Sequence, residues 1–129
     1  MPDVSCPVRL IRGVPVAAAP DRLDASASRR LRSALVQLAE RGHATLVVDL
    51  SRTRYCDSAG LSVLIGAHER ACAEGGELRL VAASRAVLRM LSLAGMSGRP
   101  RPFLSLEQAV AELPAAMIAQ PRRQLGPVG

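Results

Sequence analysis

The chain has 129 residues, enough for one ordinary domain and too few for two. Hydrophobic residues make up 49% and aromatic residues only 2%, so the core must be built from Leu, Val, Ala and Ile. The formal charge of +6 comes from arginines scattered along the chain, which contains no lysine. With neither a basic block nor aromatic stacking platforms, we expect no direct binding of nucleic acid.

Cysteine usage and hydropathy indicate a cytoplasmic protein. The three cysteines, Cys6, Cys56 and Cys72, are odd in number and lack metal-type spacing, which favours a reducing compartment and no bound metal. There is no signal-peptide pattern, and no apolar run approaches the roughly 20 residues that span a bilayer. We therefore expect no membrane association.

The first half of the chain predicts two short strands at residues 7–11 and 14–19, joined around Gly13. Residues 21–24 are predicted to be a loop. Asp24 or Ser26 then caps a helix that runs to about residue 40 and stops before Gly42. The apolar, β-branched run at residues 45–50 has the composition of a buried strand.

The second half begins with a polar loop at residues 51–56 and a helix from Asp57 to about residue 74. The apolar face of this helix repeats with helical spacing at Leu61, Leu64, Ile65, His68, Ala71 and Cys72. A strand at residues 77–82, a helix from Ser84 to about residue 94 and an edge strand within residues 100–104 follow. A last helix starts at Ser105 and has the apolar residues Leu106, Ala109, Val110 and Leu113 on one face.

The alternation of strands and helices predicts an α/β domain with a mixed, mostly parallel sheet of four to five strands and about four helices. We place this domain at residues 1–118. Residues 119–129 are dominated by Pro, Arg and Gly, and we expect them to form a disordered tail.

The pair Asp57-Ser58 lies at the point where the polar loop becomes a helix. Asp57 is a natural N-cap, which places the Ser58 hydroxyl in the first turn on a surface loop. Gly60 has no side chain, so another backbone or a partner can come close there. By spacing alone, Asp57-Ser58 is best interpreted as a plain helix cap.

Four runs follow one another along the chain, at residues 47–50, 55–61, 75–81 and 84–96. In this order they resemble the STAS domain, and more narrowly the bacterial anti-sigma factor antagonists. The resemblance implies that Ser58 is the phosphorylated residue and that Asp24, Asp57, Ala59, Gly60 and Leu61 bind the partner. The chain departs from the family pattern at Ala59, where a second hydroxyl residue is usual, and at Asp21-Arg22, where Gly-Glu is usual.

The resemblance also implies a function. A non-catalytic protein without a cofactor binds an anti-sigma factor that is a serine kinase, and the sigma factor is released. Phosphorylation of Ser58 dissociates the complex, and a PP2C-type phosphatase resets it. Two alternatives stay open: a STAS scaffold or small-ligand sensor in which Ser58 is only a cap, and an enzyme that uses Ser58 or Cys56.

Other charged residues fit less specific roles. His68 follows Ser58 by ten residues in one helix, about 15 Å along its axis, so it is interpreted as a buried structural residue and not as a general base. The run Arg52-Thr53-Arg54 is a candidate to neutralise a phosphate or attract an acidic kinase surface. Arg79, Arg85 and Arg89 indicate either a basic face toward an acidic partner or a solvated surface.

Overall fold

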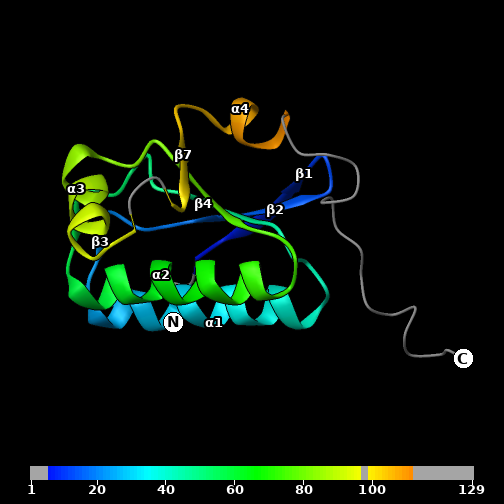
Figure 1. Ribbon diagram of the computed structural model, residues 1–129, viewed down its shortest axis with the longest axis horizontal. Helices are drawn as coiled ribbons and strands as arrows, with labels where there is room; N and C mark the ends of the chain where they lie inside the picture. The colour runs from blue at the N-terminus through cyan, green and yellow to red at the C-terminus, as the bar shows by residue number, and fades with distance from the viewer. Residues whose placement is uncertain (1–5, 97–98, 112–129) are drawn as a thin grey trace, which may run out of the picture.

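The computed structural model describes residues 6–96 and 99–111 of the chain. The elements are β1 (Val8–Ile11), β2 (Val14–Ala18), β3 (Arg22–Leu23), α1 (Ala25–Glu40), β4 (Leu46–Asp49), β5 (Tyr55–Cys56), α2 (Ser58–Ala73), β6 (Leu78–Val81), α3 (Arg85–Leu93), β7 (Arg101–Phe103) and α4 (Leu106–Ala111) (Figure 1). The predicted boundary at residue 118, the predicted tail and the core position of Leu113 lie outside the described residues.

A five-stranded sheet in the order β1-β2-β4-β6-β7 forms the centre of the domain. β1 runs antiparallel to β2, and the other neighbouring strands run parallel. The predicted α/β class and mostly parallel sheet are therefore confirmed, together with four helices in the described part of the chain.

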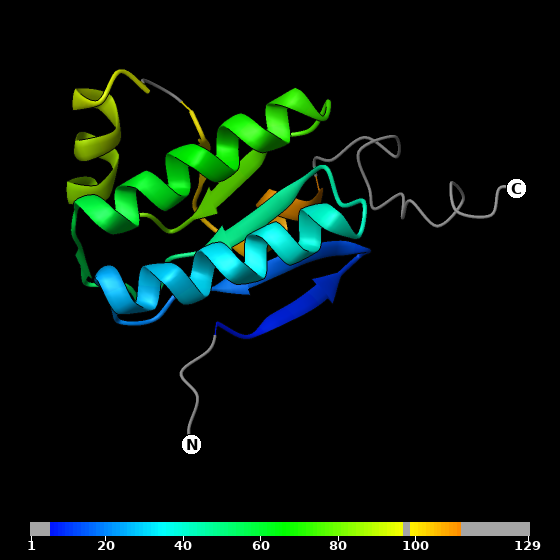
Figure 2. The same ribbon diagram turned by 90° about the horizontal axis from the view of Figure 1, so that it is seen from below.

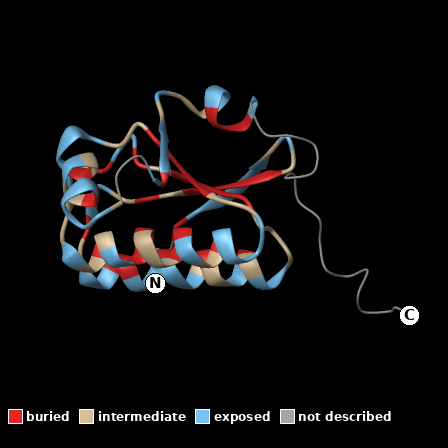
Figure 3. Ribbon diagram, in the orientation of Figure 1, coloured by how far each residue is buried: buried red, intermediate tan, exposed pale blue. Residues whose placement is uncertain are grey.

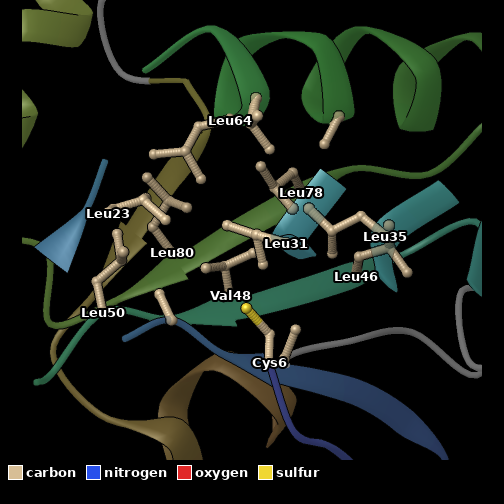
Figure 4. Packing of buried hydrophobic residues seen from close by; sticks show 14 of the residues in the cluster. Cys6, Leu23, Leu31, Leu35, Leu46, Val48, Leu50, Leu64, Leu78 and Leu80 are labelled. Atoms are coloured by element: carbon tan, nitrogen blue, oxygen red, sulfur yellow. The ribbon is translucent and has the colours of Figure 1, made fainter. Parts of the chain in front are cut away.

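The helices cover both faces of the sheet (Figures 1 and 2). On one face, Leu31 and Leu35 of α1 and Leu64 of α2 pack onto a cluster that includes Val48 and Leu80 (Figure 4). On the other face, α4 contributes Ala109 and Val110 to a smaller cluster with Val14, Val16, Val47 and Val81. Val47 and Val48 point to opposite faces because side chains alternate along a strand, which is why this apolar run is continuous. Figure 3 shows burial along β2 and β4 and exposed outer faces on the helices.

Arg79 lies in the middle of β6 and is buried, which is a correction to the predicted basic face. It is only 1% exposed. Its Nε donates to Oε2 of Glu77 at 2.8 Å, and its Nη1 donates to the carbonyl oxygen of Ala109 at 2.7 Å. Its guanidinium also stacks 4.8 Å from the centre of the Phe103 ring. Arg79 thus joins β6 to α4, whereas Arg85 and Arg89 of α3 are exposed to solvent.

Two segments that the sequence predicted as loops contain a second, smaller sheet. Strands β3 and β5, of two residues each, pair in parallel with Leu23 opposite Cys56. The buried Thr53 strengthens this connection, because its hydroxyl donates to the carbonyl oxygen of Pro20 at 2.8 Å. The loop prediction was wrong at these positions, because strands this short carry no periodicity.

None of the described helices is long and apolar enough to cross a membrane.

Candidate functional site

The start of α2 is an N-capped helix terminus. Asp57 has an extended backbone, and its Oδ1 accepts hydrogen bonds from the backbone N–H groups of Ala59 at 3.0 Å and Gly60 at 3.1 Å. Ser58 is the first residue of the helix and is exposed. The structure therefore places the Ser58 hydroxyl in solvent, next to a carboxylate that already occupies first-turn donors.

The start of α1 has the same construction. Asp24, and not Ser26, is its N-cap, and its Oδ1 accepts from the N–H of Ala27 at 3.1 Å. Both capping residues directly follow the paired residues Leu23 and Cys56 of the small sheet. The two helix N-termini are thus held side by side by the β3–β5 ladder, which brings Asp24 close to the Asp57-Ser58 pair.

Gly60 is buried beneath this surface. A Cβ atom at this position would lie 2.8 Å from the carbonyl oxygen of Leu23, 2.8 Å from Sγ of Cys56 and 2.9 Å from Cγ of Leu23. The glycine therefore lets β3 approach the first turn of α2. Of the other residues predicted to bind the partner, Ala59 and Leu61 are half-buried, and Leu61 packs against the main core.

Cys56 lies between the core and the capping aspartate. Burial and, to a lesser extent, the negative charge of Asp57 raise the pKa of its thiol. Its Sγ lies 3.6 Å from the carbonyl oxygen of Asp57 and donates to it. A protonated, half-buried thiol is a poor nucleophile, so this environment disfavours the enzymatic interpretation of Cys56.

The exposed rim of the site consists of Asp21, Arg22, Arg54 and Tyr55. The Arg22 guanidinium lies 4.2 Å from the centre of the Tyr55 ring, and Arg54 faces Asp21 at 3.9 Å. A hollow of about 400 Å³ is lined by Asp21, Ser51, Arg52 and Arg54, and Ser58 is not part of its lining. From the sequence, Arg22 stood out only as a departure from the family pattern and Tyr55 only as part of the run 55–61, and neither was predicted to bind the partner. An aromatic residue in an otherwise polar loop was the available signal.

His68 does not join this site. It is buried on α2, and its Nε2 lies 3.4 Å from Sγ of Cys72. Burial first, and then the charge of Arg99, lower its pKa despite opposing contributions from Glu77 and Glu69. The predicted structural role of His68 is confirmed. Within residues 6–96 and 99–111, no group of three or more His, Cys, Asp or Glu side chains is arranged to hold a metal ion.

The model of a known domain family, described as Mlab, STAS domain, matches residues 14–107, which is more than half of the chain. This chain belongs to the STAS domain family. The match covers both capping aspartates and Ser58 and extends into α4, so it includes the whole site together with most of the sheet.

Several proteins similar to this STAS domain are anti-sigma factor antagonists. The anti-sigma-B factor antagonist of Bacillus subtilis (strain 168) is 35% identical over 74 residues, which cover 57% of this chain and 67% of the relative. The crystal structure of an anti-sigma factor antagonist from Mycobacterium paratuberculosis has a TM-score of 0.72 at 25% identity and covers 83% of this chain and 91% of its own. The Bacillus cell fate determinant SpoIIAA in its phosphorylated form shares the fold, with a TM-score of 0.69 at 18% identity over 83% of this chain and 97% of its own.

Proposed function

We propose that this STAS domain is an anti-sigma factor antagonist that acts as a phosphorylation switch without catalysis of its own. Its binding surface, here named the cap surface, consists of Asp24, Asp57, Ser58, Ala59 and Leu61. Gly60 was also predicted to bind the partner, but it is buried and supports this surface from beneath. With Ser58 unmodified, the cap surface binds an anti-sigma factor that is a serine kinase, and the sigma factor is set free. Phosphorylation of Ser58 releases the kinase, and a PP2C-type phosphatase restores the binding form in the cytoplasm.

The exposed Ser58 hydroxyl beside the occupied N-cap carries this proposal. A phosphate at Ser58 adds a charge of about −1.5 to −2. The first-turn N–H groups of Ala59 and Gly60 already donate to Asp57. A phosphate on Ser58 would therefore lie next to a negative carboxylate and find few free N–H donors. In a contact that excludes water, this unpaired charge costs several kcal/mol, enough to separate the partners.

The rim supplies a complementary argument for an acidic partner. Arg52 and Arg54 are exposed and line a hollow with Asp21 and Ser51. Exposed guanidinium groups of this kind suit carboxylates on the kinase. Such charges act mainly by raising the rate of association.

The relatives support the regulatory part of the proposal. The curated relative antagonises an anti-sigma factor, and SpoIIAA is known in unphosphorylated and phosphorylated forms. This chain is equally similar to both forms, with TM-scores of 0.68 for the unphosphorylated form and 0.69 for the phosphorylated form. A switch that acts through charge at one exposed residue agrees with a fold that is shared by both forms.

The test compares two variants at Ser58 with a matched control one turn later in the same helix. An anti-sigma serine kinase is first sought among the proteins that co-purify with the wild-type chain. Its binding is then measured by calorimetry, and phosphate transfer is measured with radiolabelled ATP. Ser58→Ala should bind the kinase and accept no phosphate. Ser58→Asp should lose binding by at least about tenfold because it adds a charge beside Asp57. Ser62→Asp, at an exposed position of α2, should bind and be labelled like the wild type.

A plain helix cap would give another pattern. Ser58→Asp would then be silent or slightly stabilising, because acidic residues are favourable in the first turn of a helix. Equal affinity of the two Ser58 variants for the kinase, or labelling that persists in Ser58→Ala, contradicts the switch. Either result would favour the scaffold or ligand-sensing alternative.

A further inference from the structure

Among residues 6–96 and 99–111, the strand β1 is an unpaired edge of the main sheet. It pairs with β2 only, and the described residues place no strand on its other side. The N–H of Ala18 donates to the carbonyl oxygen of Pro7 at 2.9 Å, so these two residues form a hydrogen-bonded pair. Because such pairs alternate along an antiparallel ladder, the N–H and C=O groups of Val8 and Leu10 point away from β2. Pro15, which has no N–H, lies opposite Leu10 and fits this alternation.

The opposite edge of the sheet is blocked. The N–H of Ala82 donates to the carbonyl oxygen of Phe103 at 2.8 Å, so Phe103 directs its backbone groups toward β6. The neighbouring residue on β7, Pro102, therefore faces outward, and it has no N–H to offer. Proline on an edge strand prevents the addition of another chain, whereas β1 has no proline between Val8 and Ile11.

A groove runs along the exposed edge of β1 and beside α1. Its volume is about 650 Å³. The register with β2 places Val8 and Leu10 on the same face as Ala17, which is the face that α1 covers, and these two side chains are 40% and 61% exposed. The opposite wall is one helical stripe of α1 that continues into its C-cap residue, formed by Arg30, Ser33, Ala34, Gln37, Leu38 and Arg41. Figure 2 shows β1 as the outermost strand beside α1.

The charge of the groove restricts what can occupy it. Arg9, Arg30 and Arg41 are among its lining residues, and no acidic residue is. A second copy of the chain paired along β1 would bring its own Arg9 toward the same arginines, which is unfavourable. An extended segment with carboxylates beside small apolar residues matches both the arginines and the exposed Val8 and Leu10.

We propose that the β1 edge and its groove form a second docking site, which binds an extended acidic segment of a partner protein as an additional strand. Backbone hydrogen bonds to Val8 and Leu10 supply the affinity, and the arginines of α1 select carboxylates on the segment. This site uses no residue of the cap surface. The STAS domain is therefore able to hold one partner at β1 while Ser58 changes its state.

The experiment uses the full chain and a short fluorescein-labelled peptide of repeating Glu-Thr-Val-Thr, which places glutamate and valine on the same face of an extended strand, followed by fluorescence anisotropy. We expect saturable binding, and binding at least about tenfold weaker for a peptide with lysine in place of glutamate. In NMR spectra the amide hydrogens of Val8 and Leu10 should become protected from exchange when the peptide binds. Those of Arg9 and Ile11, which face β2, should be protected already.

Two variants test the two contributions separately. Leu10→Pro removes one outward N–H without removing a bond to β2, so the fold should survive and binding should fall at least about tenfold. Arg30→Gln combined with Arg41→Gln tests the charge and should weaken binding to a similar extent. The matched control, Arg85→Gln combined with Arg89→Gln on the exposed face of α3, should leave binding unchanged.

Specific outcomes overturn the proposal. They are a peptide that fails to saturate, unchanged exchange at Val8 and Leu10, or wild-type affinity in both Leu10→Pro and the Arg30/Arg41 variant. Sedimentation that shows a dimer, together with its loss in Leu10→Pro, would assign the edge to a second copy of the chain instead.

Discussion

The carbonyl oxygen of Leu23 lies 2.8 Å from the point where a Cβ on Gly60 would stand. This contact joins the end of β3 to the first turn of α2, and a second link is the hydrogen bond from the N–H of Asp57 to the same carbonyl oxygen at 3.3 Å. The geometry of the cap surface therefore depends on the absence of a side chain at one buried position.

Gly60→Ala should lower the free energy of unfolding by about 1–3 kcal/mol, because the added methyl group meets backbone that cannot move aside cheaply. Gly66→Ala is the matched control in the same helix, where the nearest atom to a new Cβ is Nη1 of Arg70 at 3.6 Å. It should stabilise the protein by about 0.5–1 kcal/mol, since alanine is the better helix former. Urea denaturation measures both. Equal effects of the two variants would show that the contact with Leu23 is relieved at little cost.

Asp57→Ala should lower the free energy of unfolding by about 1 kcal/mol, because the N–H groups of Ala59 and Gly60 lose their acceptor. Asp57→Asn keeps a side-chain oxygen and should retain most of the stability. The pair separates the capping role of Asp57 from its charge, and thermal or urea denaturation is the measurement. If Asp57→Asn lowers the free energy of unfolding as much as Asp57→Ala does, the charge, and not the hydrogen bonds, stabilises the helix start.

Arg79→Met should destabilise the fold by about 3 kcal/mol, because it leaves the carboxylate of Glu77 and the carbonyl oxygen of Ala109 without their main donor. Arg89→Met on the surface of α3 should change stability by less than about 0.5 kcal/mol. The double variant Glu77→Gln with Arg79→Met should recover part of the loss, since the half-buried side chain at position 77 then carries no charge and no longer depends on the more distant Arg101, 3.8 Å away. Without that recovery, the cost would come from packing against Phe103 and α4.

Stability should fall as the pH is lowered from about 7.5 to about 5.5, around the ordinary pKa of histidine. Burial lowers the pKa of His68 and of His43 in the folded protein, so the unfolded chain binds more protons in this range. The stabilisation is complete above the ordinary pKa and is lost as the pH falls toward the folded values. Urea denaturation measures the free energy of unfolding at the two pH values. The difference between the two values should be smaller in His68→Gln than in the wild type, and smallest in His68→Gln with His43→Gln. If the double variant shows the same difference in the free energy of unfolding as the wild type, the pH dependence comes from carboxylates and not from the histidines.

The sequence predicted those elements whose apolar pattern is long enough to show a period. The strand around Val47 and the helix that starts at Asp57 are of this kind, and the cap with its exposed Ser58 followed from residue type alone. Leu23 and Cys56 are different, because two-residue strands exist only through a tertiary contact between distant segments. The proximity of Asp24 to Ser58 depends on that contact, so local pattern did not predict it.

Arg79 shows the same limit in the core. An arginine between leucines in a strand normally indicates a solvent-facing side chain. Its acceptor, the carbonyl oxygen of Ala109, lies 30 residues further along the chain, on a helix whose position depends on the sheet. Gly60 is the intermediate case. A close approach was predicted from the missing side chain, and the structure identifies the approaching group as the backbone of Leu23.

The cap surface exists only in the folded protein, because the β3–β5 ladder brings its two halves together. Its two halves come from segments that are 33 residues apart in the sequence, since Asp24 and Asp57 each follow one strand of the ladder. A linear fragment around Ser58 contains only one of these halves and lacks the strand that holds it in place. Under the proposed function, a partner would therefore recognise a conformational surface. It would distinguish the native domain from its unfolded or nascent chain, so that only folded molecules enter the proposed regulatory cycle.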